Sequence, residues 1–207
     1  MLPTVQAIPG RSVRLVGAAV PPRFIAVGAS RAPGASDTPR DPAALRTASH
    51  ALSALFEQSC LPHAGDPAGL RALLRDRHLS PLPEAAARKA LARPGQAFAV
   101  PGPGHLMVLS FDDGWCGAGA DAVDPHALTL SLSAAVERRG LSMQLMGAGT
   151  DGREQRYLLA RDTGPRRQTA APSLALLVLM QPTATPGAMQ ANLFISPLPS
   201  DPGEDHP

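Results

Sequence analysis

The two cysteines are the residues of this sequence with the clearest chemical potential. Cys60 and Cys116 make up the whole complement, an even number. In an oxidising compartment they would form a disulfide, and in the cytosol they would be two buried thiols. A third possibility is a catalytic thiol, because His63 follows Cys60 closely and an imidazole can activate a thiolate. Cys60 falls at the C-terminal end of a predicted helix, where the helix dipole disfavours a thiolate. The residues alone leave these possibilities open.

The histidines and cysteines do not form a metal-binding pattern. A structural or catalytic zinc site needs three or four ligands at close spacing. No two histidines stand four residues apart on one helical face, and no Cys-x-x-Cys occurs. We therefore predict no metal site and no cofactor. The residues that could act as ligands are Cys60, His63, His78, His105, Cys116 and His126.

Two further motifs favour turns over chemistry. Asp112 and Asp113 could bind a cation or act as an acid and base, but neighbouring residues of a strand point to opposite faces. Asp-Asp-Gly is also typical of a turn, since Gly114 can adopt a positive φ. Residues 147–152 are rich in glycine but lack the lysine of a phosphate-binding loop, so they indicate a hairpin. Trp115 is interpreted as a core residue beside Cys116, the alternative being a ligand platform.

Four helices are predicted ahead of, and within, a series of strands. Asp41-Pro42, Asp66-Pro67 and Asp124-Pro125 each place a capping carboxylate before a proline at the first helical position. Apolar residues at helical spacing follow each pair. A shorter helix is expected over residues 84–91, before Pro94-Gly95.

Alternating or continuous apolar segments predict strands joined by short connections, which favour antiparallel pairing. We therefore predict an α+β fold: an antiparallel sheet of five to seven strands, with about four short helices packed on one face. The predicted strands cover residues 97–100, 106–111, 115–120, 141–146, 155–160, 174–180 and 190–195.

Composition divides the chain into three parts. Residues 1–40 lack a sustained apolar period and are interrupted by proline, which predicts a disordered leader. Within this leader, residues 15–29 follow two arginines and resemble a degenerate export signal. Residues 41–196 are expected to form a single domain. Residues 197–207 are expected to be a disordered tail.

Charge, aromatic content and hydropathy weigh against a nucleic-acid partner and against a membrane span. The net charge is +2, the arginines are scattered, and aromatic residues make up only 3% of the chain. A single-strand nucleic-acid binder needs a basic groove beside stacking aromatic residues, so no nucleic-acid partner is predicted. The sequence contains no run of about 18 apolar residues, so no membrane span is predicted either.

Three segments carry a resemblance to a known family. They are the helix end at residues 56–60, the Pro-Leu-Pro break at residues 81–83, and the sequence Ser-Phe-Asp-Asp-Gly-Trp-Cys at residues 110–116. The pattern resembles a small family of uncharacterised proteobacterial proteins that usually carry an export signal, over roughly residues 46–196. The resemblance implies a periplasmic or secreted domain whose cysteines pair. No activity is attached to that family, so no catalytic residue is carried over.

Three functional hypotheses follow from the sequence. The first is a non-catalytic, exported (periplasmic or secreted) accessory or binding domain stabilised by a disulfide between Cys60 and Cys116. The second is a small thiol-dependent enzyme or hydrolase that uses Cys60 or Cys116. The third is a cytoplasmic interaction module. The sequence identifies no substrate, partner or oligomeric state.

Overall fold

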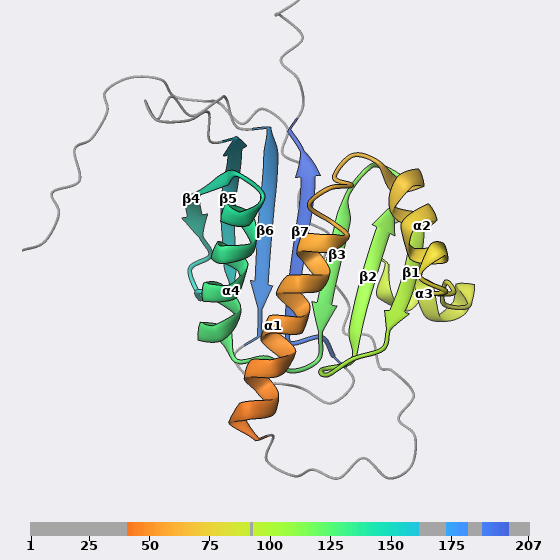
Figure 1. Ribbon diagram of the computed structural model, residues 1–207, viewed down its shortest axis with the longest axis horizontal. Helices are drawn as coiled ribbons and strands as arrows, with labels where there is room; N and C mark the ends of the chain where they lie inside the picture. The colour runs from red at the N-terminus through yellow and green to blue at the C-terminus, as the bar shows by residue number, and fades with distance from the viewer. Residues whose placement is uncertain (1–40, 92, 162–172, 182–187, 199–207) are drawn as a thin grey trace, which may run out of the picture.

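A computed structural model describes residues 41–91, 93–161, 173–181 and 188–198 of the chain (Figure 1). Four helices form: α1 (Pro42–Gln58), α2 (Pro67–Asp76), α3 (Glu84–Ala90) and α4 (Pro125–Arg138). The three Asp-Pro pairs begin helices as predicted. The side chains of Asp41, Asp66 and Asp124 accept hydrogen bonds from first-turn amides at 2.9–3.1 Å, and each following proline occupies the first turn.

Seven strands form one fully antiparallel sheet, which confirms the predicted α+β fold. Its order is β1-β2-β3-β7-β6-β5-β4. The last described strand therefore returns to the centre, where it pairs with β3, while α4 carries the chain from β3 to the far edge. The strands are β1 (Gly95–Val100), β2 (Leu106–Phe111), β3 (Cys116–Ala120), β4 (Leu141–Ala148), β5 (Glu154–Arg161), β6 (Leu174–Met180) and β7 (Ala191–Pro197).

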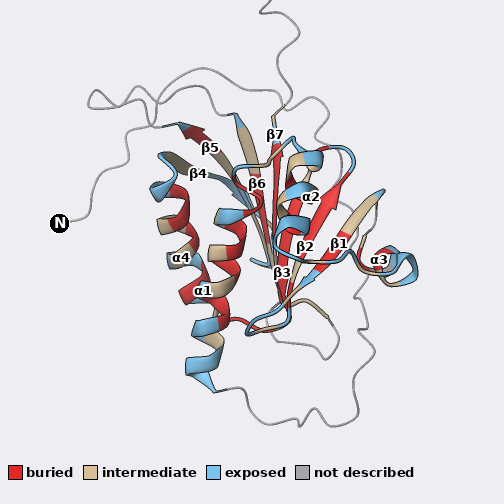
Figure 2. Cartoon of the chain, turned by 45° about the vertical axis from the view of Figure 1, so that its right-hand side comes forward, coloured by how far each residue is buried: buried red, intermediate tan, exposed pale blue. Residues whose placement is uncertain are grey.

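The larger core lies between one face of the sheet and the helices α1, α2 and α4. Helices α1 and α4 lie side by side across the strands, with their buried sides turned toward the sheet (Figure 2). Leu52, Phe56, Leu128 and Leu132 supply the helical side of this core, and Ile195 is among the buried residues beneath them. Burial of such side chains is the main favourable contribution to folding.

A smaller hydrophobic cluster lies on the opposite face of the sheet. Helix α3 packs there, whereas the prediction placed all four helices on one face. Ala87 and Ala90 of α3 pack with Phe111, Leu177 and Phe194. Helix α3 is too short to bury a wide apolar stripe, and its alanines let it approach the sheet closely. The strands thus present apolar residues to both faces, as the unbroken apolar run of β6 indicates.

The two edges of the sheet differ. Pro81 forms a bridge with Phe98 beside β1, and the amide of Leu82 donates to the carbonyl of Ala97 at 2.7 Å, so β1 is partly covered. No described residue pairs with the outer side of β4. Among the described residues, no helix is long and apolar enough to cross a membrane. The predicted leader (residues 1–40) and nearly all of the predicted tail lie outside the described residues, although β7 extends to Pro197.

Candidate functional site

The two cysteines meet where the helical part of the chain joins the sheet. Cys60 follows the end of α1, and Cys116 begins β3. Their sulfurs are bonded, and their Cα atoms lie 5.3 Å apart, within the usual range for a disulfide. Both residues are fully buried, with exposures of 0% and 1%. The disulfide expected for these two residues is therefore present, and it is part of the larger core.

The segment after α1 is held against the turn that precedes Cys116. The amide of Cys60 donates to Phe56 at 3.0 Å, which completes the helix end. The amide of Gly65 then donates to the carbonyl of Gly114 at 2.9 Å. Both glycines have a positive φ, and a Cβ on Gly114 would lie 3.1 Å from the Cα of Gly65. The disulfide and this glycine contact together fix the corner, which we call the disulfide corner (residues 59–66 and 112–116).

The paired aspartates of this corner diverge, as predicted for a turn. Asp112 forms an ion pair with Arg71 of α2, whereas Asp113 forms one with Arg93. The Arg71 side chain also donates to the hydroxyl and carbonyl of Ser110, at 3.0 and 3.1 Å. Each carboxylate is thus neutralised by its own arginine. The pair therefore does not converge on a common substrate or cation.

Trp115 lies on the other side of the sheet from the disulfide. It is half-buried against the smaller cluster. The guanidinium of Arg93 lies 4.9 Å from the centre of its ring and 5.4 Å from that of Phe111. This is cation–π geometry, and it occupies a face that a ligand would otherwise use. The arrangement agrees with the core interpretation of Trp115, with a charged residue packed on it.

The histidines are dispersed over the molecule. His63 lies within the disulfide corner, with its Nδ1 3.7 Å from an oxygen of Asp66. His105 contacts Asp121 at 2.7 Å, beyond the other ends of β2 and β3. His78 and His126 are on the outside of the molecule. Within the described ranges, no three His, Cys, Asp or Glu residues are grouped so as to hold a metal ion.

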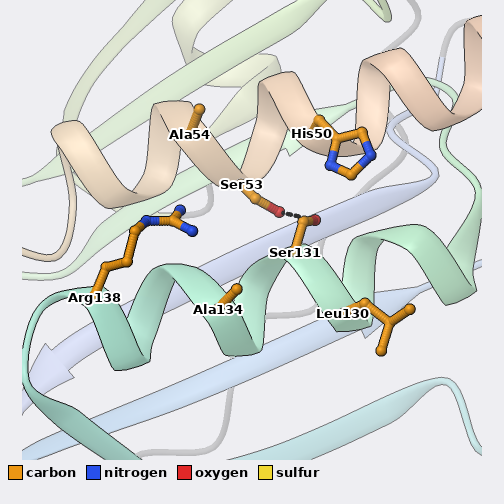
Figure 3. A pocket seen from close by; sticks show the side chains of 7 residues that line it. All are labelled: His50, Ser53, Ala54, Leu130, Ser131, Ala134 and Arg138. Carbon is orange, nitrogen blue, oxygen red and sulfur yellow. Dashed lines mark hydrogen bonds between the residues drawn. The ribbon is translucent and has the colours of Figure 1, made fainter.

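An open groove of about 410 Å³ runs along the outer side of the α1–α4 pair (Figure 3). Small residues let the two helices approach closely here. Ser53 and Ser131 share a hydrogen bond of 2.7 Å across the contact. Ser131 gives its hydroxyl proton to the carbonyl of Ala127, so Ser53 is the donor to Ser131. Both hydroxyls serve the helix contact, and His50, which also lines the groove, forms no hydrogen bond to either serine within the described part of the chain.

An ionic cluster that sequence reasoning did not find closes one end of this groove. Arg138 donates to Glu57 at 2.5 Å, and Arg139 donates to the carbonyl of Glu57 at 3.0 Å. The hydrogen bond from Arg138 lowers the pKa of the Glu57 carboxyl, and the same contact raises the pKa of the guanidinium. The adjacent arginines were visible in the sequence, but nothing in it paired them with a residue 81 positions away.

A second hollow, of about 320 Å³, includes Arg139 of this ionic cluster in its lining. Two arginines, Arg139 and Arg161, give it a basic character, and apolar residues form much of the remainder. Arg139 is already engaged by Glu57. The hollow is lined by Leu61, Pro62, Ala64, Arg139, Leu141, Arg161, Ser173 and Leu174.

Comparison of the chain with models of known protein families, with curated proteins and with solved structures gives no match.

Proposed function

We propose that this chain is an exported, non-catalytic accessory or binding domain whose fold depends on the Cys60–Cys116 disulfide. The buried bridge is the observation that carries the proposal. It joins the end of α1 to the start of β3, so it ties the helical part of the chain to the centre of the sheet. Disulfides of this structural kind form and persist in oxidising compartments, such as the bacterial periplasm.

The same geometry weighs against the thiol-enzyme hypothesis. A catalytic cysteine must be a thiolate, accessible to its substrate, and stabilised by a nearby positive charge. Cys60 and Cys116 have neither accessible surface nor a free sulfur while the bridge is present. Reduction would leave Cys60 at the C-terminal end of α1, where the helix dipole opposes its ionisation.

The polar groups of the disulfide corner support a structural role as well. Asp112, Asp113 and their arginine partners neutralise one another in separate pairs on the two sides of the turn. An active site requires polar side chains that converge on one position in a cleft. These side chains instead hold the turn in the place that the disulfide requires.

The proposal is tested by following the cysteines in cells. The full chain, with residues 1–40, would be produced in a Gram-negative host, and its thiols would be trapped with acid and then alkylated with a large maleimide. We expect the chain in the periplasmic fraction, with no alkylation before reduction and two alkylated cysteines after it. A matched chain that lacks residues 1–40 should stay in the cytosol with both thiols free. A full-length chain found in the cytosol with two alkylated cysteines would overturn the proposal.

A further inference from the structure

Among the described residues, strand β4 is an open sheet edge without the usual protection. Edge strands present unpaired backbone groups, and proteins commonly protect them with charged residues, proline or a covering segment. The eight residues of β4 include no charged residue and no proline. Leu145 and Met146 are 55% and 48% exposed, and they are two of the three large hydrophobic residues found exposed in the described ranges. A bulge between Leu145 and Gly147 is the one protective feature of this strand.

The backbone groups on the free side of β4 can be assigned from the ladder. Neighbouring residues of a strand direct their N–H and C=O groups to opposite sides. The carbonyl of Leu159 faces β6, because it accepts from the amide of Ser173 at 3.0 Å. Its partner across the β4–β5 pair is Met143, whose own N–H and C=O therefore point away from β5. Leu145, two residues further along β4, also directs its N–H and C=O groups away from β5.

We propose that β4 pairs antiparallel with β4 of a second copy of this chain, which forms a two-fold dimer with a continuous sheet. A two-fold axis brings identical surfaces together, and an uncharged strand can meet itself without like-charge repulsion. The ends of the strand add no repulsion to this pairing. Arg161 lies opposite Leu141 at one end, and in the turn at the other end Asp151 and Arg153 form an ion pair at 3.5 Å. Antiparallel pairing therefore keeps the two Arg161 side chains apart and brings each of them toward a turn whose own charges are paired.

The proposed β4–β4 contact is small, so we expect the two copies to bind each other weakly. A stable interface usually buries about 1,600 Å² in total, and smaller ones tend to be weak or transient. One pair of eight-residue strands is about 27 Å long, so it supplies a narrow interface. We therefore expect a dimer in equilibrium with the monomer, rather than a permanent one. Its population should rise with protein concentration, as measured by sedimentation velocity on the full, oxidised chain.

A lysine at position 145 provides the test, with a lysine at position 130 as its matched control. Leu145→Lys puts a charge on the edge, and we expect it to weaken dimerisation about tenfold or more. Leu130 is an equally exposed leucine, at 59%, but it lies on α4. Leu130→Lys changes the charge by the same amount and should leave dimerisation as in the natural chain. Equal melting temperatures would show that both variants fold.

An equimolar mixture of Leu145→Lys and Leu145→Glu chains provides a further check. If the two strands face each other, the mixture should form heterodimers that neither variant forms with itself. This result cannot arise from a folding defect, because each variant would carry its defect into the mixture. A natural chain that stays monomeric into the sub-millimolar range would overturn the proposal. Equal loss of dimer in Leu145→Lys and Leu130→Lys would overturn it as well.

Discussion

Removal of the disulfide is the perturbation whose effect can be worked out most directly from the structure. The bridge joins residues that are 56 positions apart. A cross-link that closes a loop of this length lowers the entropy of the unfolded chain, which corresponds to about 4 kcal/mol at 25 °C. Small domains are commonly stable by only about 5–15 kcal/mol, so this is a large fraction of the total. We expect the reduced chain to be close to unfolding.

The assay is urea unfolding of the oxidised chain, the reduced chain and a Cys60→Ala/Cys116→Ala variant. Reduction keeps both sulfurs in place, so it removes the cross-link with little change in packing. The alanine variant also loses the packing of two buried sulfurs, and it should be the least stable of the three. The urea dependence of the free energy should be steeper without the bridge, because the unfolded chain is then more expanded.

Two results would refute this reasoning. Equal midpoints for the oxidised and reduced chains would mean that the bridge does not restrict the unfolded state. A loss confined to the alanine variant would mean that packing of the sulfurs, and not the cross-link, stabilises the corner. In either case, the bridge would no longer indicate that the chain needs an oxidising compartment in order to fold.

Two further predictions concern the surroundings of the bridge. Glu57→Gln should lower the free energy of unfolding by about 1 kcal/mol at neutral pH. Because Arg138 lowers the pKa of Glu57 in the folded chain, this contribution is present above the usual carboxyl pKa and is lost as the pH falls through the lowered value. The two chains should therefore become equally stable in acid, and a difference that persists there would contradict the ion pair. Gly114→Ala should cost about 1–2 kcal/mol for its positive φ alone, plus a clash with the backbone of Gly65. The Gly140→Ala control has a similar φ and open space around it, so equal losses in chemical denaturation would rule out that close approach.

The local elements of this fold could be predicted because their signals are local. Each Asp-Pro pair combines a capping side chain with a residue that needs no helical hydrogen bond, so the starts of α1, α2 and α4 were predicted correctly. The strand segments follow from apolar patterns and turn residues. Each of the seven predicted segments overlaps a strand of the sheet, with ends that differ by at most two residues.

The arrangement of those elements depends on contacts between distant residues, which a single sequence does not reveal. The pairing of β7 with β3 joins segments more than 70 positions apart, and no turn between them dictates it. The placement of α3 on the opposite face depends on the match between Ala87 and the surface around Phe194. For the same reason, the partners of Asp112, Asp113 and Glu57 could not be predicted, although the divergence of the two aspartates could.

The position of the bridge explains why one cross-link can serve both halves of the molecule. Cys116 lies in β3, which pairs with β2 on one side and with β7 on the other. The pairing of β3 with β7 joins the β1–β3 part of the sheet to the β4–β7 part. Cys60 follows α1, which packs beside α4 over that junction. A bond between them therefore restrains the helical layer at the place where the two parts of the sheet meet. The open edge at β4 lies at the far end of the second part, away from this restraint. The disulfide and the proposed contact surface thus occupy separate regions. Leu145→Lys should therefore weaken dimerisation without changing how readily the Cys60–Cys116 disulfide is reduced.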